Sequence, residues 1–417
     1  MNRVVVTGLG VISPVGNTVA EFWKNLCDGV CGIGPITRFD TSEHKAKLAA
    51  EVKGFDPLSC FASVPEARRA DLYTQYAMGA ACEAMTDSGL DAALTAGAVN
   101  PRRVGVYVGS GIGGMSTFVN ETLKLHDRGP SRVSPLFIPM MIGNMAAGTI
   151  SIRYGLKGPT LPVVTACATS SHTVGEAFHA IRHGYADAIV AGGAEATITP
   201  LAVAGFVNCK ALSESEDPAA ASLPFDARRA GFVMGEGAAM LVLESYEHAI
   251  SRGAHIYAEV CGYGNTADAY HMTSPDPSAG GAAEAIRLAL EEAGITPSDA
   301  STIYVNAHGT GTSLNDSTET TAFKAVFGER AYDLHISSTK SMTGHMLGAT
   351  GAVEAVASVL ALRDGVVPPT INLTVPDPAC DLNYTPGVAV HTDLRTAVST
   401  SLGFGGHNAC LAFKKWG

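Results

Sequence analysis

The fold class of this chain is decided by one short stretch, LPVVTACATSS at residues 161–171. Its apolar first part, 161–166, is typical of a buried strand. Its small-residue second part leads into a helix-like pattern at 174–183. A strand that turns into a helix is the repeating unit of α/β proteins. The turn between the two patterns carries a cysteine, Cys167.

The predicted position of Cys167 favours a nucleophile. A thiol at a helix N-terminus lies near the positive end of the helix dipole and beside unpaired backbone N–H groups. These surroundings favour the thiolate over the thiol, which would make Cys167 reactive. The alternative is that a free cysteine is simply a small buried hydrophobe, and we apply this interpretation to the other candidates. They are Cys82, Cys209, Cys261 and Cys410.

Short apolar runs alternate with longer amphipathic stretches along the whole chain. In the first part, strand patterns occupy 4–7, 104–108, 163–167 and 188–191, and helix patterns occupy 73–88 and 174–183. A similar order recurs later, with strands at 239–243, 257–261, 302–306, 336–338 and 398–401 and helices at 282–293 and 351–362. We therefore expect an α/β protein with mostly parallel sheets, built from two comparable halves, 1–255 and 256–417.

The composition narrows the possible functions. A chain of 417 residues in which only 16% are charged and 46 are glycine is typical of a compact enzyme with many tight turns. The net charge of −11 argues against general nucleic-acid binding. Nine cysteines without a Cys-x-x-Cys pair favour free thiols in a reducing cytoplasm. Because the first residues form a strand pattern with no long apolar segment, we expect neither secretion nor membrane spanning.

Two histidines stand in glycine-containing turns of the second half. His308 lies in NAHGT at 306–310, and His345 lies in TGHM at 343–346. A single histidine in a turn usually does no more than satisfy a hydrogen bond. Two of them, with Lys340 close by in the sequence, favour a Cys/His/His site together with Cys167.

Two other patterns are weaker candidates. The segment GSGIGG at 109–114 matches a dinucleotide-binding pattern but lacks the acidic residue expected about twenty positions later. His172, His179 and His183 share one helical face, but no carboxylate or thiolate joins them at ligand spacing. We therefore interpret these histidines as core or supporting residues, and we expect neither a metal nor an organic cofactor.

Taken together, the motifs resemble those of the beta-ketoacyl-acyl carrier protein synthases, most closely the type II synthases of fatty acid elongation. The resemblance covers essentially the whole chain. The motifs are VVVTGLG at 4–10, TAC at 165–167, AGGAE at 191–195, NAHGT at 306–310, STKSMTGH at 338–345 and GFGGHN at 403–408. The resemblance implies a thiolase-like fold, an internally duplicated αβαβα structure, and a homodimer.

The resemblance also implies a reaction. Cys167 would take an acyl group from acyl carrier protein, and the backbone N–H groups of Cys167 and Phe404 would bind the oxyanion. Malonyl-acyl carrier protein would then lose carbon dioxide while neutral His308 and His345 donate hydrogen bonds to the enolate. The product would be a 3-oxoacyl group that is two carbons longer.

Further residues correspond to supporting and substrate positions of the family. Lys340 and Glu354 correspond to a pair that supports the histidines. Four hydroxyl-bearing residues correspond to contacts with the phosphopantetheine arm, although turn chemistry explains them as well: Thr310, Thr312, Thr273 and Ser274. Ile112 corresponds to a bulky gate of the acyl pocket, which implies activity on long chains. Phe137 and Phe206 match other pocket or gate positions, with core packing as the alternative for all three.

Four basic residues match positions that face the acidic carrier protein: Arg68, Arg69, Arg132 and Lys210. Ordinary solvated surface charge is the alternative interpretation, but an acidic enzyme needs a basic patch to bind an acidic partner.

Two residues depart from the family pattern, and several other functions remain open. Gly311 replaces a frequent Ser, as is also common in polyketide ketosynthases, and His407 replaces a frequent Thr. A stand-alone polyketide-type ketosynthase is therefore an alternative, and the fatty acid assignment rests on length and the lack of flanking domains.

A chain-length-factor-like partner subunit would have lost the nucleophile. A degradative thiolase would carry a second reactive cysteine late in the chain, and a type III synthase would pair its cysteine with one His and one Asn.

Overall fold

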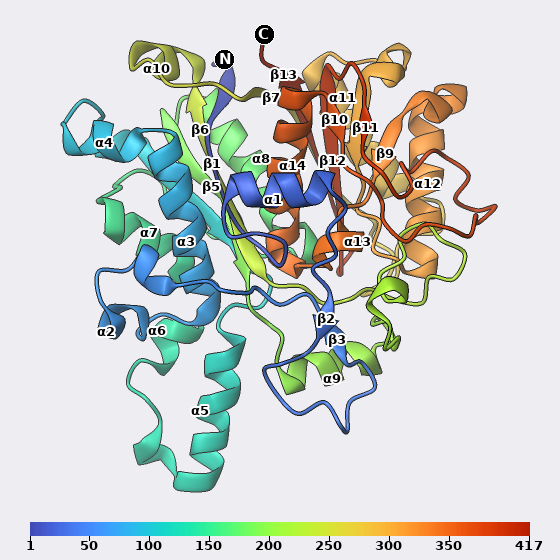
Figure 1. Cartoon of the computed structure of the whole chain (residues 1–417). Coiled ribbons are helices and arrows are strands. Elements are labelled where there is room, and N and C mark those ends of the chain that lie inside the picture. Colours follow the sequence, from blue (N-terminus) through green and yellow to red (C-terminus); the bar gives the residue numbers. More distant parts are fainter.

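The computed structural model describes the whole chain, residues 1–417, and its centre is one nine-stranded sheet (Figure 1). The strand order is β4-β5-β6-β1-β7-β13-β12-β8-β9. The first half of the chain supplies β1 (Val4–Ile12), β4 (Val104–Gly109), β5 (Ala188–Glu195) and β6 (Gly237–Ser245). The second half supplies β7 (Ala258–Ala267), β8 (Ile303–Asn306), β9 (His335–Ser337), β12 (Thr396–Gly403) and β13 (His407–Lys415).

Helices form three layers around the two halves of this sheet. On the outer face of the first half lie α3 (Leu72–Asp87) and α7 (Met145–Tyr154). On the outer face of the second half lies α11 (Gly280–Ala293), with α12 (Ser313–Phe327) packed against it. Between the halves lie α8 (Thr169–Arg182) and α14 (Thr350–Asp364). In α14 every residue from 350 to 362 is buried, as expected for a helix enclosed on all sides. The layers are therefore αβαβα, as expected from the family resemblance.

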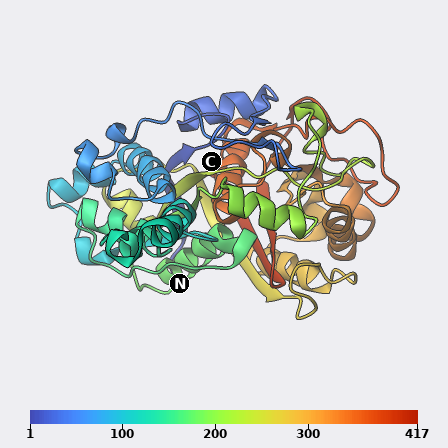
Figure 2. The same cartoon turned by 90° about the horizontal axis from the view of Figure 1, so that it is seen from below.

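The two halves repeat the same path. In the first half β4 runs parallel to β5, which is antiparallel to β6; in the second half β8 runs parallel to β12, which is antiparallel to β13. Each half also has a 3-10 turn that leads into a central helix: η4 (Ala166–Ala168) precedes α8, and η8 (Leu347–Ala349) precedes α14. Ala166 and Leu347 even share a left-handed backbone, with φ of 51° and 46°. Figure 2 shows the halves side by side, blue to green and orange to red.

Two expectations about the strands are wrong. The sheet is mixed, and only the pairs β4–β5, β8–β12 and β8–β9 are parallel. The strands β12 and β13 are joined by a short loop instead of a helical crossover, which makes them antiparallel. Residues 163–167 form no strand, because the chain pairs with β4 only near Thr160 and then leaves the sheet. Gly109 permits this path, since a Cβ there would lie 2.2 Å from the Val163 carbonyl oxygen.

No helix in the structure combines the length and the apolar character that a membrane crossing requires.

Candidate active site

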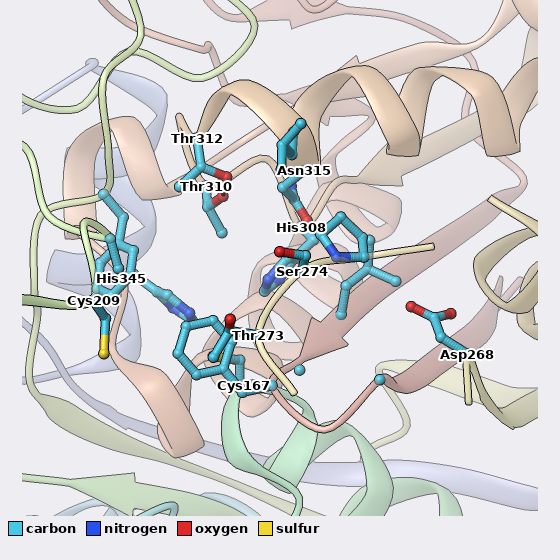
Figure 3. Close-up of a pocket in the computed structure, with 18 of the residues that line it drawn as sticks. Cys167, Cys209, Asp268, Thr273, Ser274, His308, Thr310, Thr312, Asn315 and His345 are labelled. Carbon is cyan, nitrogen blue, oxygen red and sulfur yellow. Dashed lines mark hydrogen bonds between the residues drawn. The ribbon is translucent and has the colours of Figure 1, made fainter. Parts of the chain in front are cut away.

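A pocket of about 250 Å³ lies where the two halves meet, and it collects the predicted Cys/His/His residues (Figure 3). Cys167 comes from η4 at the start of α8. His308 follows Ala307, just beyond the Asn306 end of β8, and His345 follows the short helix α13 (Lys340–Thr343). Phe404 enters the pocket from the loop between β12 and β13.

The thiol of Cys167 is buried, with 9% of the residue exposed. Burial raises its pKa to about 12, although the Lys340 ammonium and the backbone N–H groups of Phe404 and Cys167 act in the opposite direction. The helix dipole and the unpaired N–H groups were expected to favour the thiolate. Loss of hydration opposes them and is the largest effect on the pKa of this thiol.

The loop that carries Phe404 passes very close to the cysteine turn. A Cβ on Gly403 would lie 2.7 Å from the Thr165 carbonyl oxygen and 3.4 Å from the Cys167 nitrogen. Only glycine fits there without displacing the backbone. This close approach places the backbone N–H groups of Phe404 and Cys167 near the sulfur, where both act to lower the pKa of the thiol.

The two imidazole rings lie edge to face, with 5.3 Å between their centroids. Both histidines are almost fully buried, and burial together with the Lys340 charge holds their pKa values well below the usual range. The rings are therefore neutral at physiological pH. Nδ1 of His345 lies 2.9 Å from the Thr350 hydroxyl, whereas its Nε2 is buried without a hydrogen-bond partner.

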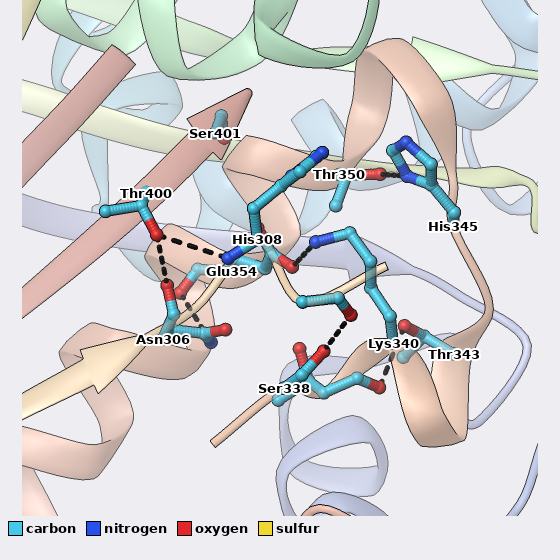
Figure 4. Close-up of polar contacts among 12 residues, drawn as sticks. Asn306, His308, Ser338, Lys340, Thr343, His345, Thr350, Glu354, Thr400 and Ser401 are labelled. Carbon is cyan, nitrogen blue, oxygen red and sulfur yellow. Dashed lines mark hydrogen bonds and ion pairs between the residues drawn. The ribbon is translucent and has the colours of Figure 1, made fainter. Parts of the chain in front are cut away.

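The backbone at His308 is fixed by a buried carboxylate that the sequence analysis missed. Glu319, on α12, accepts hydrogen bonds from the N–H groups of His308 (2.7 Å) and Gly309 (2.8 Å). The Thr400 hydroxyl, on β12, donates to the same carboxylate at 2.6 Å. Figure 4 shows Thr400 beside this backbone. The only signal of Glu319 in the sequence is an acidic residue on a helix face that is otherwise buried.

Lys340 and Glu354 form an ion pair beneath the histidines, and each side chain is 1% exposed (Figure 4). Burial raises the pKa of Glu354 to about 7, against the opposing effect of the Lys340 charge. The second carboxylate oxygen of Glu354 has no hydrogen-bond partner. The pair therefore keeps the Lys340 ammonium close to both histidines.

The four hydroxyl-bearing residues expected to contact the phosphopantetheine arm all line the pocket: Thr310, Thr312, Thr273 and Ser274. Lys210, which was expected to face the carrier protein, lines it as well. The hydroxyls of Thr310 and Thr312 lie 3.0 Å apart. The pocket is also lined by residues that the sequence analysis missed, namely Phe232, Asp268, Asn315 and Leu402. Asn315 follows the Gly-Thr-Gly-Thr turn closely enough to be suspected, whereas nothing in the sequence pointed to Phe232.

The three expected acyl-pocket residues do not line this pocket. Ile112 lies in the loop after β4 and is 43% exposed. Phe137, on α6 (Phe137–Met141), packs against Phe118 with 6.4 Å between ring centroids. Phe206, on α9 (Pro200–Asn208), packs against Phe232 and Phe404, with centroid distances of 5.6 Å and 6.4 Å. Only Phe206 therefore contacts a wall of the pocket in the single chain.

The remaining basic residues lie on the surface. Arg68 and Arg69 are exposed directly after the short helix α2 (Val64–Ala67). Arg132 lines a groove together with Lys124 and Arg128 of α5 (Met115–Arg128). The sequence analysis missed these two neighbours, although Lys124 and Arg128 lie four positions apart, which places them on the same face of a helix.

The other cysteines differ partly from expectation. Cys261 and Cys410 are buried, as predicted. Cys82 is only half-buried, and Cys209 is exposed at the pocket, which contradicts the buried interpretation. Cys209 directly follows the C-terminus of α9, where the helix ends at the protein surface.

Comparisons with known proteins agree with this geometry. The models of the beta-ketoacyl synthase N-terminal and C-terminal domains match residues 1–249 and 257–374. A Synechocystis sp. protein named 3-oxoacyl-[acyl-carrier-protein] synthase 2 is 50% identical over 415 residues, covering 99% of this chain and 98% of its own. A beta-ketoacyl synthase from Burkholderia phymatum superposes with a TM-score of 0.91 at 36% identity, covering 100% of both chains. A type II polyketide ketosynthase, solved in complex with its acyl carrier protein and bound to a hexaketide, gives 0.89 at 36%, also over 100% of both chains.

Proposed function

The chain belongs to the beta-ketoacyl synthase family, and from this premise we propose how its own residues carry out the family reaction. The protein is an acyltransferase of fatty acid biosynthesis, a 3-oxoacyl-acyl carrier protein synthase of the second type. It condenses an acyl group with malonyl-acyl carrier protein, releases carbon dioxide and forms 3-oxoacyl-acyl carrier protein. The observation that carries the assignment of residues is the convergence of Cys167, His308 and His345 on one pocket.

In the first step, the Cys167 sulfur attacks the thioester carbon of acyl-acyl carrier protein. The backbone N–H groups of Cys167 and Phe404 donate to the oxyanion, which offsets the charge that develops there. The carbon–sulfur bond to phosphopantetheine breaks, and the thiol proton of Cys167 ends on the departing sulfur. This route suits a thiol whose resting pKa is high, because no stable thiolate is needed before the substrate arrives.

In the second step, malonyl-acyl carrier protein occupies the same pocket. Neutral His308 and His345 donate hydrogen bonds from Nε2 to the thioester oxygen as carbon dioxide leaves, and this stabilises the enolate. The hydroxyl of Thr350 donates to Nδ1 of His345 and so keeps the proton on Nε2. The enolate carbon attacks the acyl-Cys167 carbonyl, the bond to sulfur breaks, and Cys167 takes up one proton.

The phosphopantetheine arm runs along Thr310, Thr312, Thr273 and Ser274, whose hydroxyls line the entrance. The acidic carrier protein itself binds to basic residues, namely Arg68, Arg69, Arg132 and Lys210. Lys124 and Arg128 add to the charge around Arg132. The carrier protein seen on the related polyketide ketosynthase supports this partner.

The protein acts as a homodimer. Around the edge of β4, the single chain exposes apolar side chains that a second copy would cover. They include Phe118, Ile138, Ile152, Leu161 and Val164, which are 41%, 54%, 79%, 44% and 58% exposed. Ile112 and Phe137 lie on this same side of the molecule, so the dimer would complete the long-chain acyl pocket that they are expected to gate. The nine free cysteines support a cytoplasmic location.

The halves 1–255 and 256–417 remain our proposed units, one carrying the nucleophile and the other the two histidines. A polyketide-type ketosynthase stays the second candidate, since Gly311 matches that class. The 50% identity to a 3-oxoacyl-acyl carrier protein synthase favours fatty acid elongation over it.

The deciding experiment follows each half-reaction separately. Intact-mass spectrometry after incubation with palmitoyl-acyl carrier protein should show one acyl group on Cys167, and malonyl-acyl carrier protein should then yield carbon dioxide and a 3-oxoacyl product. An unmodified Cys167, or acceptance only of polyketide intermediates, would contradict the proposal.

A further inference from the structure

Glu195, the last residue of β5, is a fully buried carboxylate to which the proposed reaction gives no role. Its oxygens accept hydrogen bonds only from a hydroxyl and from backbone N–H groups. A carboxylate buried without a cation is costly unless neutral donors saturate it. Burial raises the pKa of Glu195 to about 7, and the four hydrogen bonds act in the opposite direction.

The four donors belong to two separate loops. From the loop after β4, the Ser110 hydroxyl donates at 3.0 Å, and the N–H groups of Gly111 and Ile112 donate at 2.9 Å and 3.3 Å. From the turn η8, the N–H of Gly348 donates at 3.0 Å. Gly111 and Gly348 share the same oxygen, Oε2. Glu195 therefore connects the loop that carries Ile112 to the turn that follows His345.

The two loops also touch directly. A Cβ on Gly348 would lie 2.3 Å from the Gly111 nitrogen and 2.8 Å from Oε2 of Glu195. A Cβ on Gly111 would lie 3.6 Å from the carbonyl oxygen of Ala166, the residue before Cys167. A shift of the Ile112 loop is therefore transmitted to η8 through backbone contacts that leave no free space.

The turn η8 in turn sets the position of His345. Leu347 holds a left-handed backbone with φ of 46°, which a side-chain-bearing residue adopts only where its surroundings enforce it. Leu347 is directly followed by Gly348, which donates to Glu195, and the same turn leads to Thr350, which contacts the His345 ring. Displacement of η8 would rotate Nε2 of His345 away from the substrate oxygen.

We propose that Glu195 is a positioning residue that couples the acyl side of the active site to the decarboxylating side. An acyl chain that passes Ile112 moves the N–H groups of Gly111 and Ile112, Glu195 follows them, and η8 brings His345 into its working position. Malonyl decarboxylation is thereby fast on the acylated enzyme and slow on the free enzyme. This inference rests on the proposed function, because it assumes that acylation and decarboxylation take place in this pocket.

The test compares decarboxylation by the acylated and the free enzyme. Carbon dioxide release from malonyl-acyl carrier protein is measured with the full-length protein before and after acylation of Cys167 by palmitoyl-acyl carrier protein. In Glu195→Gln the new amide NH₂ faces backbone N–H groups that need an acceptor, so the ratio of the two rates should fall about tenfold. The variant Ile112→Ala, at a half-exposed site, should fold normally and should also lower the ratio.

Glu244→Gln is the matched control. Glu244 is another fully buried carboxylate at the end of a strand, but its partners are Arg252, His248 and Thr7, far along the sheet from the pocket. It should lose thermal stability and keep the wild-type rate ratio. The coupling is wrong if the ratio of the two decarboxylation rates is unchanged in both Glu195→Gln and Ile112→Ala. It is also wrong if Glu244→Gln lowers this ratio as much as Glu195→Gln does. If the free and the acylated wild-type enzyme release carbon dioxide at equal rates, the coupling is wrong and the proposed function stands. If Cys167 is not acylated, the proposed function itself is wrong.

Discussion

His308 and His345 come from different loops, yet their rings meet almost perpendicularly, at 87° with 5.3 Å between centroids. The same Lys340 charge and the same lack of water depress both pKa values. One pocket thus contains two neutral donors whose shared environment opposes protonation of either.

Replacing His308 or His345 by Ala should separate the two half-reactions. Carbon dioxide release from malonyl-acyl carrier protein should fall at least about a hundredfold, because one donor to the enolate is lost. Acylation of Cys167 should continue, since its oxyanion is bound by backbone N–H groups. Loss of a radiolabelled carboxyl group from malonyl-acyl carrier protein measures decarboxylation, and intact mass measures acylation of Cys167. Equal losses of both activities would contradict the assigned roles.

Cys167→Ala should abolish condensation, because the acyl group has no atom to bind. Decarboxylation of malonyl-acyl carrier protein should still be measurable, since His308 and His345 remain. The check is product analysis with palmitoyl- and malonyl-acyl carrier protein together. Condensation at the wild-type rate would remove Cys167 from the mechanism.

Gly403→Ala should slow acylation of Cys167 by about a hundredfold, which is the typical effect of losing one oxyanion donor. A Cβ would lie 2.7 Å from the Thr165 carbonyl oxygen, so the Phe404 loop must move away from the sulfur. Stopped-flow release of the carrier-protein thiol measures this step. Gly205→Ala, at an exposed glycine of α9 whose Cβ would meet nothing, is the control and should react normally.

Acidification should destabilise the fold through the buried histidines. Their pKa values are lowered in the folded state, so below the ordinary value of about 6.5 the unfolded chain binds protons that the folded chain rejects. Each histidine should contribute a loss of up to about 1.4 kcal/mol per pH unit below that point. Urea unfolding at several pH values measures the slope, which should become shallower in His345→Ala; an identical slope would show that His345 does not contribute.

Charge reversal in the α5 groove should weaken binding of the carrier protein. The double substitution Arg128→Glu and Arg132→Glu should raise the KM for acyl-acyl carrier protein about tenfold or more and leave turnover at saturation nearly unchanged. Because the attraction is electrostatic, wild-type KM should also rise with salt. Arg102→Glu, outside the groove, serves as the control. If Arg102→Glu raises the KM as much as the double substitution does, the carrier protein responds to the overall charge of the enzyme and not to this groove.

The sequence predicted the parts of the molecule that depend on local pattern. The strand and helix periods located β4, β5, α8 and α14, and the motifs identified Cys167, His308 and His345 correctly as neighbours in space. The failures concern properties that only the assembled chain defines. The parallel sheet was wrong because strand direction depends on the length of the connections, and a three-residue loop between β12 and β13 permits only an antiparallel pair.

The environment of the pocket was equally beyond local pattern. The thiolate of Cys167 was expected from the helix N-terminus, whereas the dominant effect is burial by residues distant in sequence. Glu319 and Glu195 were not recognised as positioning groups because most of their partners are backbone N–H groups. Every residue except proline has such a group, so the sequence gives no sign of which ones will meet a carboxylate. Ile112 and Phe137 lie outside the pocket of the single chain, on the apolar surface that we propose a second copy covers, and local pattern does not mark such a surface.

The doubled architecture gives the chain two equivalent turns but only one reactive centre. Gly348 stands in η8 at the place that Cys167 holds in η4, and no side chain of any kind could be tolerated there, because Gly111 and Glu195 already fill the space. The turn η8 thus has a supporting role, because it packs against the loop and the carboxylate beside the Cys167 turn. A point mutation at Gly348 therefore cannot place a second nucleophile in η8 without displacing Gly111 and Glu195, and each subunit keeps one catalytic centre.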